Sequence, residues 1–126
     1  LTGIGGSSKY FIGSIVCYGN NIKKSELNVS QKNLDKYGAV SEKVVKDMAK
    51  NIRNKFNSSI GVATSGIAGP TGGTKNKPVG TVFIAYSDSK KTISKKLLLT
   101  RERKINNELT CLSILNMIRL KLLNYI

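Results

Sequence analysis

Histidine and tryptophan are absent from the sequence, and cysteine and proline occur only twice each. Without histidine, a zinc site of the usual kind has almost no ligands to draw on, and we expect neither a metal nor another cofactor. The two cysteines, Cys17 and Cys111, stand in apolar contexts. We expect them to be buried free thiols of a reducing, cytoplasmic compartment rather than partners in a disulfide.

Long apolar runs are also missing. No segment approaches the ~18–20 apolar residues that span a bilayer, and no signal-peptide pattern opens the chain, so no membrane partner is expected. A length of 126 residues with 40% hydrophobic residues is ordinary for one globular domain, which we place at residues 1–126.

Acidic residues are scarce: 21 Lys and Arg stand against 7 Asp and Glu, a formal net charge of +14. A basic surface can bind nucleic acid by releasing counterions from phosphate. The lysines are nevertheless spread along the whole chain, with no dense basic tract and no stacking aromatics interleaved among them. We therefore expect no specific nucleic-acid partner. A basic interaction module without a small-molecule role remains an alternative.

Apolar spacing predicts an α/β fold. Ser41 is a suitable N-cap for an amphipathic helix that runs to Phe56, and runs rich in β-branched side chains indicate strands. Turn residues at 87–90 join two of these strands into a hairpin. The predicted strands are residues 11–18, 60–65, 79–87 and 92–99. Strands separated by helices predict a layered α/β/α sandwich around a mixed sheet.

A long C-terminal helix, from about residue 103 to residue 125, is expected to pack on this sheet. Its buried stripe is predicted from apolar side chains that recur every three to four residues. The predicted stripe consists of Ile105, Leu109, Leu112, Leu115, Ile118 and Leu122.

A glycine-rich loop, Gly66 to Gly73, follows the apolar run at residues 60–63. Four glycines and one proline in eight residues exclude regular structure. Such a loop lets the backbone approach a ligand closely and turn its N–H groups toward an anion. A tight surface turn is the alternative for any glycine-rich loop taken alone.

The flanking residues give this loop a context. Residues 64–73 (T-S-G-I-A-G-P-T-G-G) and 77–82 (K-P-V-G-T-V) resemble the T-G-I-A-G-P-x-G-G…K-P-V-G-T-V signature of CinA C-terminal domains. Residues 18–23 (Y-G-N-N-I-K) are similar to that family's Y-S-N-x-x-K segment, and residues 38–41 match its G-A-V-S helix entry. The motifs occur in order over essentially the whole chain. The resemblance implies a CinA C-terminal-like fold and a nicotinamide-nucleotide amidase, which hydrolyses the carboxamide of nicotinamide mononucleotide to the acid and ammonia.

The resemblance also implies two catalytic residues, Tyr18 and Lys23. Amide hydrolysis through a serine needs a group that takes the hydroxyl proton and later protonates the leaving ammonia. A lysine can do this where burial lowers its pKa, with a tyrosine hydroxyl as relay. The alternative is a solvated lysine and a strand-end aromatic.

A nucleotide substrate would contact the glycine loop and the start of the last helix. By resemblance, Arg103 is a phosphate contact, Gly19 replaces a family serine, Ser65 replaces a family glycine where space is tight, and Asn107 stands where the family has a second arginine. The predicted substrate-binding residues are Asn20, Thr64, Ser65, Gly66, Ala68, Gly69, Gly72 and Arg103.

The family's attacking serine lies in an E-S-C-T-G-G segment, which the 126 residues do not contain. We therefore expect a domain that is N-terminally incomplete relative to the family, either as a fragment of an amidase or as an inactive member that keeps a nucleotide-binding or interaction role. An incomplete sheet would expose apolar surface, so a homodimer is expected.

Overall fold

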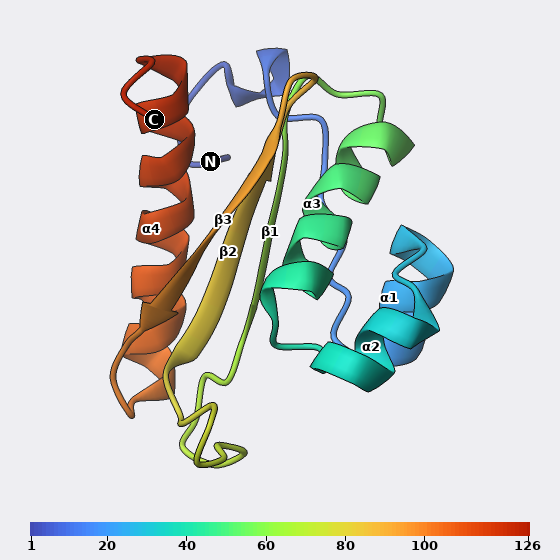
Figure 1. The fold of residues 1–126 in the computed structure, drawn as a ribbon. Coiled ribbons are helices and arrows are strands. Elements are labelled where there is room, and N and C mark those ends of the chain that lie inside the picture. The colour runs from blue at the N-terminus through green and yellow to red at the C-terminus, as the bar shows by residue number, and fades with distance from the viewer.

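Three strands form a sheet with helices on both faces in the computed structural model, which describes residues 1–126. The elements in chain order are the 3-10 helix η1 (Ser7–Lys9), α1 (Asn20–Leu27), α2 (Gln31–Tyr37), α3 (Glu42–Lys55), β1 (Gly61–Gly66), β2 (Thr81–Ser87), β3 (Thr92–Leu98) and α4 (Arg103–Leu122). Figure 1 shows α3 on one face of the sheet and α4 on the other, with α1 and α2 beyond α3. The predicted α/β class is confirmed, and the layers follow the predicted α/β/α order.

The sheet is antiparallel throughout, in the order β1-β2-β3. The predicted hairpin is confirmed by the pairing of β2 with β3. Its turn is closed by Asp88, whose Oδ1 accepts hydrogen bonds of 2.8 Å from the backbone amides of Lys90 and Lys91. The predicted mixed sheet is wrong: the long glycine loop returns β2 antiparallel to β1, so no parallel pair forms.

The central strand β2 is covered on both faces. Val82, Ile84 and Tyr86 pack toward α4, and the intervening Ala85 packs toward α3. Successive side chains of a strand point to opposite faces, so a strand covered on both sides reads as a nearly continuous apolar run. The apolar strand sequence thus follows from its central position.

Residues 11–18, predicted to be a strand, are extended but pair with no strand. Ile15 and Cys17 pack in a cluster with side chains of α3, whereas Ile12, Val16 and Tyr18 are exposed. The burial therefore alternates as in a strand, while residues 12–18 make no backbone-to-backbone hydrogen bond. Alternation of apolar and polar residues indicates that one side of the segment is buried, but it does not indicate that a neighbouring strand pairs with it.

The expected helix α4 is present, but its predicted buried stripe is wrong for most members: Ile118 packs against the β2 cluster, whereas Leu122 is exposed. Ile105, Leu109 and Leu112 are exposed, while Ile114, Met117 and Asn106 are buried. Ile114 and Met117 contact the β2 face described above. Apolar residues occur on both sides of this helix, so spacing alone does not identify the side that meets the sheet.

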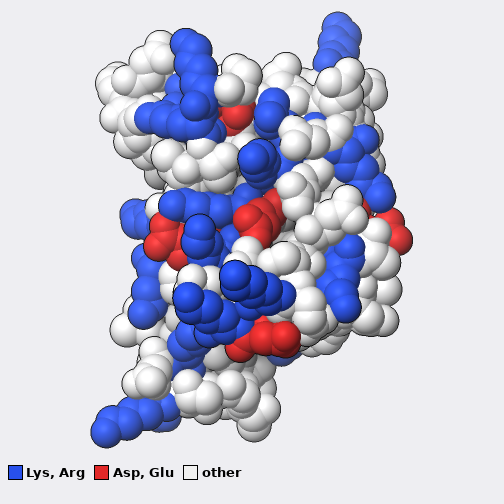
Figure 2. All heavy atoms as spheres, turned by 45° about the vertical axis from the view of Figure 1, so that its right-hand side comes forward, with Lys and Arg blue, Asp and Glu red and all other residues white.

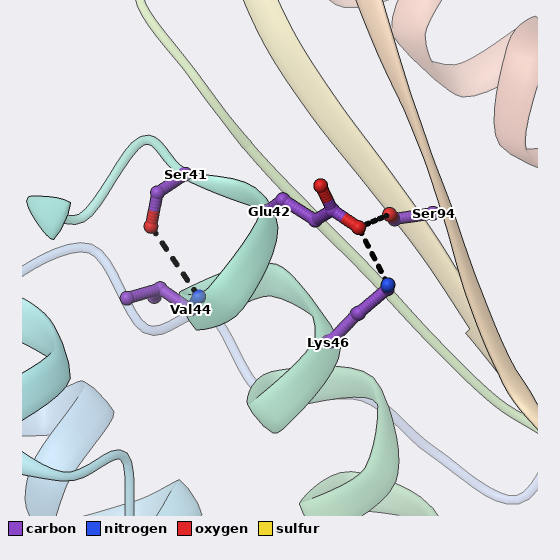
Figure 3. Close-up of polar contacts among 5 residues, drawn as sticks. All are labelled: Ser41, Glu42, Val44, Lys46 and Ser94. Carbon is purple, nitrogen blue, oxygen red and sulfur yellow. Dashed lines mark hydrogen bonds and ion pairs between the residues drawn. The ribbon is translucent and has the colours of Figure 1, made fainter.

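Helix α3 begins at the predicted N-cap. Ser41 is buried, and its Oγ accepts a hydrogen bond of 3.3 Å from the Val44 amide and donates one of 2.8 Å to the Gly38 carbonyl. Figure 3 shows the cap beside Glu42, which binds Lys46 within the helix and Ser94 of β3. The cap thus satisfies a free amide of the first turn where the helix enters the core.

The substitution Ser41→Ala is expected to lower the free energy of unfolding by about 1–2 kcal/mol, because it removes the cap and leaves the Val44 amide without an acceptor. Chemical denaturation measures this loss. Ser30→Ala is the control, because Ser30 caps the short helix α2 but is exposed. An equal loss in the two variants would contradict the role of burial at Ser41.

No helix combines the length and the apolar composition that a membrane crossing requires. Figure 2 views the face that carries α1, α2 and α3. Lys and Arg side chains are spread over this face, with acidic side chains and uncharged surface between them.

Candidate functional site

One cavity of about 340 Å³ lies where the end of the extended segment, the first residues of α1, the end of β1 and the first turns of α4 meet. Its lining residues come from segments far apart in the sequence. They are Cys17, Tyr18, Asn20, Lys23, Ala39, Val40, Thr64, Ser65, Gly66, Ala68, Val82, Arg103, Asn107 and Thr110.

The sequence-predicted site residues largely come together here. All of them except Gly69 and Gly72 line this cavity. Asn107, noted above only as standing where the family has a second arginine, and Thr110, which was not predicted, lie four and seven positions after Arg103 and thus on the same side of α4. That helical spacing could have identified Thr110 from the sequence, whereas Cys17, Ala39 and Val40 carried no such signal.

Lys23 is the most unusual residue of the cavity. Its side chain is only 6% exposed, and no carboxylate forms an ion pair with it. Its Nζ donates hydrogen bonds to the backbone carbonyls of Cys17 at 2.8 Å and Tyr18 at 3.2 Å. Burial lowers the pKa of the Lys23 ammonium from its ordinary value of 10.5, with a smaller opposing effect of Cys17.

A neutral lysine amine has two N–H donors and one lone pair. Two carbonyl acceptors at Lys23 Nζ can take both donors and leave the lone pair free. The arrangement is therefore compatible with a general base, because a lone pair in a cavity can accept a proton from a group placed there.

The neighbouring Cys17 thiol is not activated. Burial raises its pKa, and the opposing effect of Lys23 is smaller. A raised pKa keeps the thiol protonated near neutral pH, and a thiol is a much weaker nucleophile than a thiolate. Cys17 is buried and free as expected, but the expectation that Cys111 is buried is wrong, because that thiol lies on the exposed side of α4.

Arg103 joins the glycine loop to Tyr18. Its Nη1 donates to the Gly69 carbonyl at 3.0 Å, and its Nη2 donates to the Tyr18 hydroxyl at 3.2 Å. The Tyr18 side chain is otherwise largely exposed. The Tyr18 hydroxyl thus contacts Arg103, while it is the Tyr18 carbonyl that contacts Lys23.

The glycine loop carries several backbone amides without an acceptor in the chain. No hydrogen bond to a protein atom is made by the N–H groups of Ala68, Gly69, Gly72 or Gly73. Gly69 is buried, and unpaired buried amides are rare in folded proteins. A loop of this kind offers donors to an anion.

Ser65 holds the site together instead of crowding it. Its Oγ donates a hydrogen bond of 2.8 Å to the carbonyl of Ala39, which precedes α3. The side chain that was expected to fill tight space is thus directed at a backbone acceptor. It connects β1 to the segment between α2 and α3.

Comparisons with known proteins agree with this architecture. The family model described as "CinA C-terminal domain" matches residues 1–122. The chain is 52% identical to a "CinA-like protein" of Cytophaga hutchinsonii over 97% of its own length and 29% of that protein. A "CinA-like protein" of Amoebophilus asiaticus is 46% identical over the same shares. The chain therefore spans about three tenths of the length of these relatives.

Solved structures give the same result. The competence/damage inducible protein CihA from Agrobacterium tumefaciens superposes with a TM-score of 0.90 at 31% identity, covering 93% of this chain and 72% of that one. The competence damage-inducible protein A (ComA) from Klebsiella pneumoniae gives a TM-score of 0.93 at 25% identity, covering 99% and 78%. The match over residues 1–122, the close relatives and the shared fold together show that this chain belongs to the CinA C-terminal domain family.

Proposed function

We propose that this domain forms the substrate pocket and supplies the general base of an amidase that converts nicotinamide mononucleotide to nicotinate mononucleotide and ammonia. The observation that carries the proposal is Lys23, a buried amine without a carboxylate partner that lines a cavity of about 340 Å³. This volume falls within the ~300–1,000 Å³ range of small-molecule sites.

In the proposed reaction, Lys23 accepts the proton of an attacking serine hydroxyl, and the serine oxygen bonds to the carboxamide carbon. Lys23 then returns the proton to the amide nitrogen as the C–N bond breaks, and ammonia leaves. Water then attacks the acyl-serine: Lys23 takes a proton from the water and gives it to the serine oxygen as the bond between that oxygen and the acyl carbon breaks. Residues 1–126 contain no E-S-C-T-G-G segment, so the serine would come from outside them.

The nucleotide phosphate would bind at Arg103 and the glycine loop. The Arg103 guanidinium has five N–H donors, and its two protein contacts leave others for a ligand. The unpaired amides of Ala68 and Gly69 are adjacent in sequence to the Gly69 carbonyl that Arg103 contacts. Cationic and amide donors at one place are suited to a phosphate anion.

The test is release of ammonia from nicotinamide mononucleotide by a chain that carries an E-S-C-T-G-G segment ahead of residue 1. We expect steady turnover from this chain and none from the same chain with its serine changed to alanine. The 126-residue chain serves as a second control and should not turn the nucleotide over. A serine-bearing, folded chain that releases no ammonia would refute the proposal.

A second candidate is a domain that binds the nucleotide without hydrolysing it. It is favoured by Asn107, which lines the cavity where the resemblance implies an arginine. Loss of one cation at a phosphate site weakens binding without changing the fold. Calorimetric binding of nicotinamide mononucleotide to a serine-bearing chain that releases no ammonia would support this candidate.

We also expect the 126-residue chain to self-associate. Val16 is 82% exposed and Leu112 is 63% exposed, and large exposed apolar side chains favour association in water. Sedimentation velocity should show dimers or larger species, shifted toward monomer by Leu112→Glu. Ser89→Glu adds the same charge at the exposed β2–β3 turn and should leave the distribution unchanged. A monomeric wild-type chain would contradict this expectation.

A further inference from the structure

Asn106 is a polar side chain in an almost completely buried position. It lies in the first turns of α4 and is 1% exposed. A buried carboxamide is costly unless its donors and acceptor are all used. The partners of the Asn106 carboxamide therefore decide whether this position is stabilising.

The carboxamide of Asn106 is fully hydrogen-bonded. Its Oδ1 accepts from the backbone amide of Thr100 at 2.9 Å and from the Thr100 hydroxyl at 2.8 Å. Its Nδ2 donates to the carbonyls of Thr100 and Ala68, both at 2.9 Å. The contacts with Thr100 are local, six positions away, whereas Ala68 belongs to the glycine loop.

Three successive carbonyls of that loop are held by hydrogen bonds. The Ile67 carbonyl accepts from the Gly80 amide at 2.8 Å, the Ala68 carbonyl from Asn106, and the Gly69 carbonyl from Arg103. Each trans peptide group is planar, so its N–H points opposite to its carbonyl. Fixing the Ile67 and Ala68 carbonyls therefore fixes the directions of the next two amides, those of Ala68 and Gly69.

Those two amides are among the loop amides that have no acceptor in the chain, and Gly69 is buried. Ala68 lines the cavity, and Gly69, which is not one of the lining residues, follows it directly on the loop. We infer that Asn106 is a positioning residue that orients the Ala68–Gly69 peptide so that its N–H can bind the phosphate of a nucleotide ligand. The inference rests on the proposed function for the identity of the ligand, but the anion site itself can be tested without turnover.

The experiment compares two variants at the same junction. Asn106→Asp keeps an acceptor for Thr100 but removes the donor to the Ala68 carbonyl and places a carboxylate beside it. Thr100→Val removes the hydroxyl that binds Asn106 Oδ1 and leaves the Asn106–Ala68 bond in place. Both variants should lose stability, whereas only Asn106→Asp should disturb the glycine loop.

Inorganic phosphate and nicotinamide mononucleotide are the probes, and ¹H–¹⁵N spectra of the 126-residue chain are the readout. In the wild type, the Ala68 and Gly69 amide signals should shift on titration. The dissociation constant should rise about 10- to 100-fold in Asn106→Asp, the range expected for a lost charge-assisted contact. It should rise less than about threefold in Thr100→Val, where the Asn106–Ala68 hydrogen bond remains. In a serine-bearing chain, Asn106→Asp should raise KM with little change in kcat.

Nicotinamide riboside, which lacks the phosphate, separates the roles. Asn106→Asp should leave the kinetics of the riboside nearly unchanged if Asn106 acts through the phosphate. The inference is overturned if the wild-type amides do not shift at any phosphate or nucleotide concentration, or if the two variants weaken binding equally. Amide shifts in the 126-residue chain, together with no ammonia release from a folded serine-bearing chain, would refute the amidase and leave the role of Asn106 standing.

Discussion

Lys23→Ala in a serine-bearing chain is expected to lower the rate of ammonia release by about 10²–10⁴-fold, the usual contribution of a general base. The substitution removes the amine that lines the cavity and contacts the Cys17 and Tyr18 carbonyls. Lys23→Arg should not restore the rate, because a guanidinium stays protonated and cannot act as a base.

The pH dependence of the rate of ammonia release is a second test of Lys23. Burial lowers the pKa of Lys23, so the rate should rise with pH through a titration below 10.5. That limb should vanish in Lys23→Ala. Lys24→Ala is the matched control, because Lys24 is the exposed neighbour on α1 and should keep nearly full activity. A Lys23→Ala variant within tenfold of the wild-type rate would show that another group is the base.

Gly69→Ala should produce the largest loss of stability among the loop variants, about 2–5 kcal/mol. Gly69 has a φ of +91°, and an added Cβ would lie 2.5 Å from Val79 Cγ1 and 3.0 Å from the Arg101 carbonyl oxygen. The left-handed backbone costs a non-glycine residue about 1–2 kcal/mol, and overpacking adds about 1–3 kcal/mol.

Gly72→Ala separates these two causes. Gly72 has a φ of +90°, but an added Cβ would meet nothing nearer than Ile67 Cγ2 at 3.7 Å. Only the backbone cost of about 1–2 kcal/mol should remain. Denaturant unfolding measures both free energies, with an unchanged slope if the denatured state is unaffected. Equal losses in the two variants would exclude steric crowding at Gly69.

The sequence predicted the parts of this fold that local chemistry controls. The cap at Ser41, the turn at Asp88 and the helix that follows Ser41 all depend on side chains a few residues apart. These contacts form wherever the segment folds, so residue type and spacing are sufficient to predict them.

The errors concern relations between distant segments. Residues 11–18 alternate as a strand should, but a ladder needs a partner that alternation does not specify. In α4, Ile105 and Leu112 were predicted to be buried, yet Asn106 takes the inner position because backbone groups of Ala68 and Thr100 meet it there. Such partners are brought together only by the tertiary structure.

The candidate site divides in the same way. Motif resemblance placed Tyr18, Lys23 and Arg103 in one pocket, and the structure brings all three to one cavity. The contacts among them were not foreseen: Arg103 binds the Tyr18 hydroxyl, and Lys23 binds two carbonyls. A motif names the residues that share a site, while hydrogen bonds depend on side-chain conformations that no spacing determines.

The buried amine of Lys23 makes folding itself a proton-releasing event. Its pKa is lowered in the folded chain and returns to about 10.5 on unfolding, so between these two values the unfolded chain binds more protons. The free energy of unfolding must therefore rise with pH across that window. Below the folded pKa of Lys23 both states are protonated, and the full free-energy penalty of burying the charge remains.

The raised pKa of Cys17 lowers the free energy of unfolding as the pH rises above 9.0, the ordinary value for a thiol. The increase in stability due to Lys23 should therefore be clearest below that pH. Unfolding midpoints measured at increasing pH up to 10.5 should climb more steeply in the wild type than in Lys23→Met, which carries the same Cys17. The amine proposed as the base would then be held in this fold at the expense of stability. Parallel pH profiles in the two proteins would contradict that view.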